Sequence, residues 1–193
     1  AKPERLLRRP RGGPLIVFNH HLHLIGGQKM ALNNNGNKRF DRTLHDANDP
    51  GSRRKIIEHL TLCGYECSEN PDKYGIDVIA TKNGETYLVE VERKKRWSGP
   101  HFQYGDVQIP YRKKKFKDTE GNVIFVVFNR EMTHFCVTPS ASLLDENVRP
   151  VRNIYSGAEF ENFFFVPVGE FKWATWGQPD DGDLLNFATA NIN

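Results

Sequence analysis

The sequence is poor in cysteine and has no long apolar run. Its three cysteines, Cys63, Cys67 and Cys136, cannot all pair, whereas small secreted domains depend on dense disulfide frameworks. No stretch is apolar over the length needed to cross a bilayer, and no signal peptide is recognisable. We therefore expect an intracellular, cytoplasmic protein with no membrane partner, compatible with a bacterial or phage origin.

A complete set of zinc ligands is also missing. His59, Cys63 and Cys67 lie close together in the sequence, but no second close pair completes the four ligands of a structural zinc site. Buried thiols are the interpretation we favour for these cysteines.

The length of 193 residues suits one domain with its own core and appendages. Residues 1–50 are predicted to form a basic arm and a polar linker, because arginine, proline and glycine dominate the arm. We expect the domain itself over residues 51–176. Residues 177–193 are acidic and are expected to form a flexible tail.

A β-hairpin is predicted at residues 75–94. Two runs rich in valine and isoleucine are joined through Asn83-Gly84, a pair that tolerates the positive φ angles of a tight turn. Side chains alternate across a strand, so Glu90, Glu92 and Lys94 share one face. Pairing about the turn places Asp77 beside Glu90, which creates a cluster of carboxylates.

Such a cluster has two interpretations. Carboxylates held close together in a sheet repel one another unless a cation neutralises them, and Mg²⁺ does so with oxygen ligands while keeping waters that can attack a phosphodiester. Alternatively, Glu90 and Glu92 simply alternate on a strand that faces solvent. Asp77 in the neighbouring strand favours the metal site.

This arrangement resembles the core of the PD-(D/E)xK nuclease superfamily. It has an acid in one strand, a hairpin turn, three apolar residues and an acid-apolar-charged triplet. It is most similar to Holliday-junction-resolvase-like members, in which an acid-bearing helix ending in glycine and an aromatic residue precedes the strands. Residues 53–63 followed by Gly64-Tyr65 match that helix, and the resemblance covers residues 52–95.

The resemblance implies an α/β fold with a restriction-endonuclease-like mixed β-sheet core flanked by helices. It implies a DNA endonuclease that hydrolyses phosphodiester bonds with Mg²⁺, or with Mn²⁺ in its place. DNA is the expected partner, RNA stays open as a substrate, and a homodimer is compatible with the fold. The implied metal ligands are Glu58, Asp77, Glu90 and the backbone carbonyl of Val91.

The sequence departs from the superfamily pattern at the motif lysine, which is Glu92 here. A similar glutamate occurs in certain restriction endonucleases. Lys94 could supply the cation from the same face, or Glu92-Arg93-Lys94 could itself be the triplet. We assign catalytic roles to Asp77, Glu90, Glu92 and Lys94, and a lysine within 113–115 could also stabilise charge on the phosphate.

A basic block follows the acids. Between residues 93 and 117 there are nine lysines and arginines and one acid, Asp106, a distribution suited to holding phosphates. A solvated surface is the alternative. The predicted nucleic-acid contacts are Lys95, Arg96, Arg112, Lys113, Lys114 and Lys115.

Other elements and functions are predicted less directly. Trp97, Phe102 and Tyr104 could stack on bases, although filling a core is slightly favoured. Further elements are a helix capped by Ser52, strands at 65–69, 122–128, 133–137 and 160–168, and a short helix at 139–144. Two other functions stay open, namely an inactive nucleic-acid-binding module of the same fold and a partner-binding assembly protein.

Overall fold

The computed structural model describes residues 50–72, 74–152, 160–179 and 184–185. The chain divides into two units, residues 1–30 and 31–193. The first unit, and with it the predicted basic arm, lies outside the described residues. The fold given below is that of the second unit.

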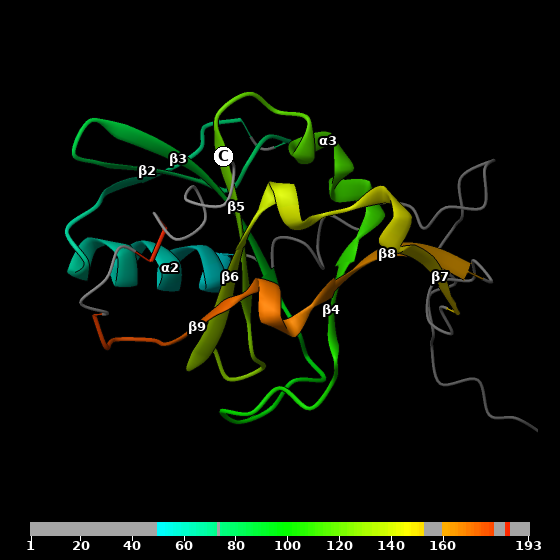
Figure 1. Cartoon of the computed structure of the whole chain (residues 1–193). Helices are drawn as coiled ribbons and strands as arrows, with labels where there is room; N and C mark the ends of the chain where they lie inside the picture. Colours follow the sequence, from blue (N-terminus) through cyan, green and yellow to red (C-terminus); the bar gives the residue numbers. More distant parts are fainter. Residues whose placement is uncertain (1–49, 73, 153–159, 180–183, 186–193) are drawn as a thin grey trace, which may run out of the picture. The chain divides into compact units, whose positions relative to one another are not determined.

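A mixed six-stranded sheet forms the centre of this unit (Figure 1). Its order is β1-β2-β3-β5-β6-β9, in which β3 and β5 are parallel and all other neighbours antiparallel. The strands are β1 (Glu66–Glu69), β2 (Val78–Lys82), β3 (Glu85–Arg93), β5 (Asn122–Phe128), β6 (His134–Pro139) and β9 (Lys172–Thr175).

A second sheet of three strands has the order β4-β8-β7. Its strands are β4 (Asp106–Pro110), β8 (Phe160–Pro167) and β7 (Val148–Arg152). The helices of the described chain are α2 (Pro50–Leu62), α3 (Lys114–Lys117) and four 3₁₀ turns, η1 (Tyr111–Lys113), η2 (Ser140–Ser142), η3 (Asp145–Asn147) and η4 (Val168–Glu170). The predicted α/β fold with a mixed sheet and flanking helices is therefore confirmed.

The predicted hairpin is formed by β2 and β3. Asn83 and Gly84 have φ angles of 53° and 82°, as expected for a two-residue turn whose twist matches that of the strands. The register pairs Val78 with Val89 and Lys82 with Glu85. Local turn chemistry thus sets which residues of the two strands lie opposite each other.

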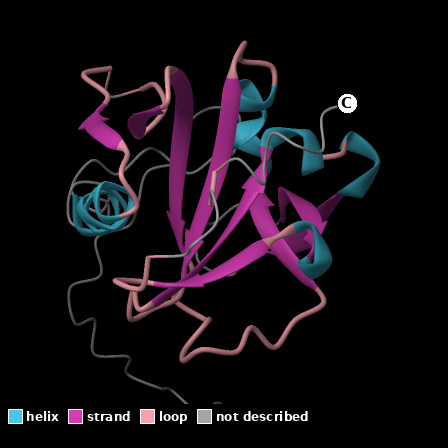
Figure 2. Ribbon diagram, turned by 60° about the vertical axis from the view of Figure 1, so that its left-hand side comes forward, coloured by secondary structure: helices cyan, strands magenta, loops and turns pink. Residues whose placement is uncertain are grey.

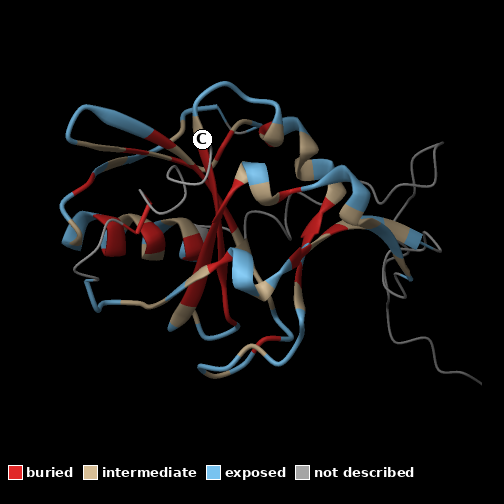
Figure 3. Cartoon of the chain, viewed as in Figure 1, coloured by how far each residue is buried: buried red, intermediate tan, exposed pale blue. Residues whose placement is uncertain are grey.

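The two faces of the large sheet are buried by different partners (Figure 2). Helix α2 covers one face, where Ile56 and Leu60 join Val89 and Val91 in one apolar cluster. The second sheet covers the other face, where Phe125 and residues of β4 and β8 form another cluster. Strand β5 is buried from Val123 to Phe128 (Figure 3), which confirms the predicted central strand covered on both sides.

Several local predictions are corrected. Helix α2 begins at Pro50, so Ser52 lies buried inside the first turn and is not the N-cap; proline is favoured at the start of a helix because it lacks the N–H that would have no partner there. The predicted helix at 139–144 is only the 3₁₀ turn η2. Leu184 and Leu185, inside the predicted flexible tail, are buried in the cluster beneath α2.

The four other predicted strands are confirmed, with ends that differ by a few residues. The segments at 65–69, 122–128, 133–137 and 160–168 correspond to β1, β5, β6 and β8. Gly64 has a φ of 83° just after α2, the left-handed conformation that commonly ends helices. No helix in the described part of the chain is long and apolar enough to cross a membrane.

Candidate active site

Glu90 is a buried carboxylate paired with a lysine from a distant segment. It lies in the middle of β3, and its side chain is only 2% exposed. Lys113, the last residue of η1, places its Nζ against Glu90 Oε1. The other carboxylate oxygen, Oε2, is buried and has no hydrogen-bond partner among the described residues. A buried acceptor without a partner is costly, so this oxygen marks a position where a cation fits.

Lys113 also approaches the next acid on the same face of β3. Its Nζ lies 3.9 Å from Glu92 Oε2, while Lys94 Nζ lies 3.8 Å from Glu92 Oε1. The ring of the buried Phe116 lies 5.9 Å from Lys113 Nζ, within cation–π range. The structure therefore brings Glu90, Glu92, Lys94 and Lys113 together.

Asp77 lies one residue before the start of the neighbouring strand, β2. Continuing the β2–β3 register by one residue places it opposite Glu90. Its Oδ2 accepts a hydrogen bond of 2.9 Å from the amide of Val91, and its Oδ1 lies 3.5 Å from Arg53 Nε of α2. Asp77 thus satisfies a β3 amide from a position just before the first residue of β2.

The prediction that Asp77 and Glu90 repel each other unless a metal neutralises them is corrected, because each acid lies beside a basic side chain. Arg53 lies beside the first acid and Lys113 beside the second, and an opposite charge within about 4 Å favours the ionised form of a carboxylate. Charge compensation comes from one arginine of α2 and one lysine of η1.

The predicted metal ligands are only partly brought together. Glu58 is exposed on α2, and no group of three histidine, cysteine, aspartate or glutamate side chains within the described ranges is arranged to hold a metal. A three-acid site of Glu58, Asp77 and Glu90 is therefore not formed. At about 100° per residue, Glu58 lies on the opposite side of the helix from the buried Ile56 and Leu60.

The basic block divides into paired and exposed parts. Lys95, Arg96, Arg112 and Lys115 are exposed. Lys114 and Lys117 each lie 3.3 Å from Asp145 of η3. The hydrogen bond to Tyr111, followed by that to Asp145, raises the pKa of Lys114. Asp145 was missed by sequence reasoning because it lies far along the chain from the lysines.

His59 of α2 has structural partners, and two of the three cysteines have raised thiol pKa values. His59 Nδ1 accepts a hydrogen bond of 3.2 Å from the Gly177 amide, and His59 Nε2 lies 3.6 Å from Cys63 Sγ. Burial raises the pKa of the Cys67 thiol and that of the Cys136 thiol. Raised thiol pKa values are typical of packed, unreactive cysteines.

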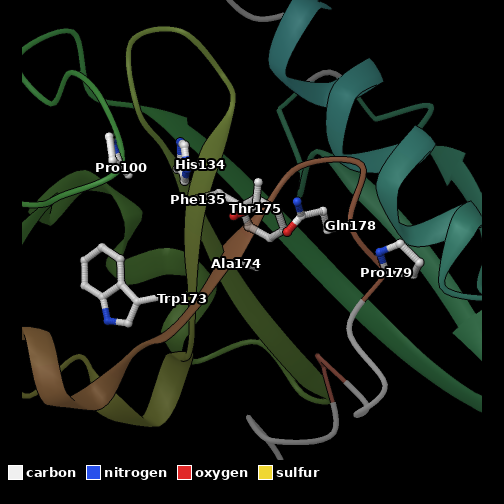
Figure 4. A pocket seen from close by; sticks show the side chains of 8 residues that line it. All are labelled: Pro100, His134, Phe135, Trp173, Ala174, Thr175, Gln178 and Pro179. Carbon is white, nitrogen blue, oxygen red and sulfur yellow. The ribbon is translucent and has the colours of Figure 1, made fainter.

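The predicted aromatic segment fills a core more than it offers a surface. Trp97 is buried, and its ring lies 5.4 Å from that of Phe102 and 5.5 Å from that of Trp173. A pocket of about 360 Å³ opens nearby, lined by residues that include His134, Trp173 and Thr175 (Figure 4). None of the predicted site residues lines it.

Comparison with known proteins gives a limited result. No family model matches the sequence, and no curated protein matches it by sequence. The structure is similar to that of a Holliday junction resolvase from the archaeal hyperthermophile Archaeoglobus fulgidus, with 10% identity and a TM-score of 0.36 over 62% of this chain and 91% of the resolvase. It is also similar to a bacterial homing endonuclease, with 16% identity and a TM-score of 0.34 over 47% of this chain and 61% of that protein. At such low scores these likenesses carry no argument about function, which depends on the site itself.

Proposed function

We propose that this protein is a metal-dependent nuclease that hydrolyses phosphodiester bonds in DNA. The observation that carries the proposal is the buried carboxylate of Glu90, with one oxygen against Lys113 and the other without a partner in the described structure. The ion pair with Lys113 involves Oε1 and leaves Oε2 available. An unsatisfied oxygen in a cluster of two acids and two lysines suits a site that receives a ligand.

The donor set is compatible with Mg²⁺ or Mn²⁺. Glu90 Oε2, the carboxylate of Asp77 and the carbonyl of Val91 would supply hard oxygen ligands, the type that these ions prefer. Few protein ligands suffice for Mg²⁺, because it usually retains several waters. When bound, the ion would make a water more acidic and offset charge on the phosphate.

The remaining side chains have roles that follow from their positions. Glu92, beside Glu90 on one face of β3, would accept the proton of the attacking water. Lys113, with Nζ between the two acids, would donate to a phosphate oxygen on which charge develops. Lys113 would thus take the role of the superfamily lysine from another element, with Lys94 holding Glu92.

A cleavage assay tests the proposal. Plasmid, branched and single-stranded DNA are incubated with the protein and Mg²⁺, Mn²⁺ or EDTA. We expect cleavage with the metal ions and none with EDTA, and Glu90→Gln should abolish it at a temperature at which circular dichroism shows that the variant is still folded. Cleavage that persists equally in EDTA and in Glu90→Gln would refute the assignment.

A nucleic-acid-binding module without activity is the second candidate. It is favoured by the arrangement of Arg53 at Asp77 and Lys113 at Glu90, which balances both acids without a metal. If this candidate is right, the affinity for DNA or RNA should not change when divalent ions are added. A homodimer is compatible with either function, and sedimentation in the presence and absence of DNA tests it.

A further inference from the structure

Tyr74 is the most exposed large apolar side chain of the described chain. Its exposed fraction is 80%, although tyrosine is usually at least half buried. No contact of its ring with another ring or with a cation occurs within the described residues. The residue lies three positions before Asp77 in the sequence. A ring exposed to solvent this close to a candidate active site is available to contact a bound substrate.

The loop that carries Tyr74 is held in place by backbone and side-chain hydrogen bonds. The Asn70 amide donates to the Asp77 carbonyl at 3.0 Å and closes the loop. The Tyr74 amide donates to Asp72 Oδ1 at 2.9 Å. A β-carbon at Gly75 would come within 2.9 Å of Asn70 Nδ2 and 3.3 Å of Asp72 Cβ, so a side chain there would require these neighbours to shift. Tyr74 is therefore exposed while its own amide and its neighbours Asn70 and Asp72 are held by hydrogen bonds.

A lysine of the basic block joins this loop to the candidate site. Lys115 Nζ donates to the Tyr74 carbonyl at 2.7 Å and lies 4.5 Å from the centre of the Phe116 ring. Lys115 is two residues after Lys113, which pairs with Glu90. Both sides of this contact thus belong to segments that also carry candidate site residues.

From this arrangement we infer that Tyr74 is a stacking platform for an unpaired base next to the scissile phosphate. This inference rests on the proposed function and names its substrate class as nucleic acid with an unpaired or splayed base. Three residues span at most about 11 Å, and one strand rises about 3.4 Å per nucleotide. The stacked base would lie within roughly three nucleotides of the phosphate that is cleaved.

The surroundings of Tyr74 favour a base over a protein partner. A protein interface would place apolar neighbours around the ring, whereas Tyr74 is flanked by Gly75 and contacts Asp72 and Lys115 through its backbone. An exposed ring whose own backbone carbonyl accepts a hydrogen bond from a lysine suits a nucleotide, because a base can stack on the ring while the nearby cation attracts a phosphate.

The test measures binding and cleavage separately. Oligonucleotides carry the fluorescent base 2-aminopurine, either unpaired in a single strand or bulge or paired in a duplex, and Glu90→Gln is used for binding so that no cleavage occurs. Tyr74→Ala in that background should weaken binding of the unpaired probe by about 10-fold, the effect of one lost stacked base, and should remove fluorescence quenching. Tyr74→Phe, which keeps the ring, should restore both, and duplex binding should be unchanged.

Phe160→Ala is the matched control, since Phe160 of β8 is also an exposed aromatic residue, at 56%. Equal losses on paired and unpaired probes, or an altered oligomeric state in Tyr74→Ala, would overturn the inference. If the wild type cleaves and Tyr74→Ala cleaves every substrate equally well, the inference fails while the proposed function stands. If the wild type never cleaves but the ring-dependent binding holds, the proposed nuclease activity fails and the binding role of Tyr74 stands.

Discussion

Lys113 and Glu90 are 23 residues apart in the sequence and form an ion pair that is 16% and 2% exposed. Removing one partner of a buried pair leaves an unpaired charge, which typically costs about 3–5 kcal/mol. Lys113→Met should therefore lower the free energy of unfolding by about that amount, measured by urea denaturation without metal. The double variant Lys113→Met/Glu90→Gln should recover most of the loss, since no isolated charge remains.

The same variant reports on metal binding. Glu90 in Lys113→Met has no lysine beside it, so Mg²⁺ should raise its melting temperature more than that of the wild type. An ion present at about one hundred times its dissociation constant stabilises the folded state by about 2.7 kcal/mol. A melting temperature that does not change with Mg²⁺ in either protein would favour the nucleic-acid-binding module without activity.

Substitutions at Glu90, Glu92 and Lys94 test whether Glu90-Val91-Glu92 or Glu92-Arg93-Lys94 is the catalytic triplet. Because Glu90 has the buried oxygen without a partner, we expect Glu90→Ala to abolish cleavage. Glu92→Lys recreates the commoner superfamily pattern and should retain some activity. Cleavage rates on one DNA substrate measure both effects. Activity that survives in Glu90→Ala while Lys94→Ala is inactive would move the site to Glu92-Arg93-Lys94.

Asp77 should contribute to stability through two separable contacts. Asp77→Asn keeps an oxygen for the Val91 amide but loses the charge beside Arg53, and we expect a loss of about 1 kcal/mol or less, typical of a partly accessible pair. Asp77→Ala also leaves the Val91 amide without an acceptor, which should cost about 1–3 kcal/mol more. Equal unfolding free energies for the two variants would contradict this hydrogen bond.

Exposed residues of the basic block should dominate the salt dependence of DNA binding. Each phosphate contact contributes roughly 0.9 to the slope of log affinity against log salt on duplex DNA. Arg112→Ala and Lys115→Ala should each flatten that slope by about this amount. Arg54→Ala, which removes an exposed arginine of α2, is the control and should leave the slope unchanged. A slope that responds to Arg54 but not to Arg112 would relocate the binding surface.

Glu131 should make the loop after β3 sensitive to acid. The Arg130 guanidinium beside Glu131 lowers the pKa of that carboxyl from 4.5 to about 2, and Glu131 also accepts hydrogen bonds from Ser98 Oγ and the Gly99 amide. A lowered pKa in the folded state gives stability that is complete above about pH 4.5 and is lost as the pH falls through 2. Between these values the melting temperature of the wild type should fall more steeply than that of Glu131→Gln; parallel curves would contradict the role of Glu131.

Local sequence features determined the hairpin and the central strand of this protein. Asn83-Gly84 can adopt positive φ angles, so it sets the register of β2 and β3 and places Asp77 opposite Glu90. The apolar run of β5 could only be stable with both faces covered. The clustering of Glu90, Glu92 and Lys94 on one face follows from strand periodicity, since such signals depend only on near neighbours in the chain.

Tertiary structure alone decided which groups face one another. The pairing of Lys113 with Glu90 and of Arg53 with Asp77 depends on how η1 and α2 pack against the sheet, and neither is encoded in a spacing. Exposure of Tyr74 and burial of Leu184 and Leu185 depend on packing in the same way. Helix rotation turned Glu58 outward, because burying Ile56 and Leu60 leaves the residue midway between them on the solvent side.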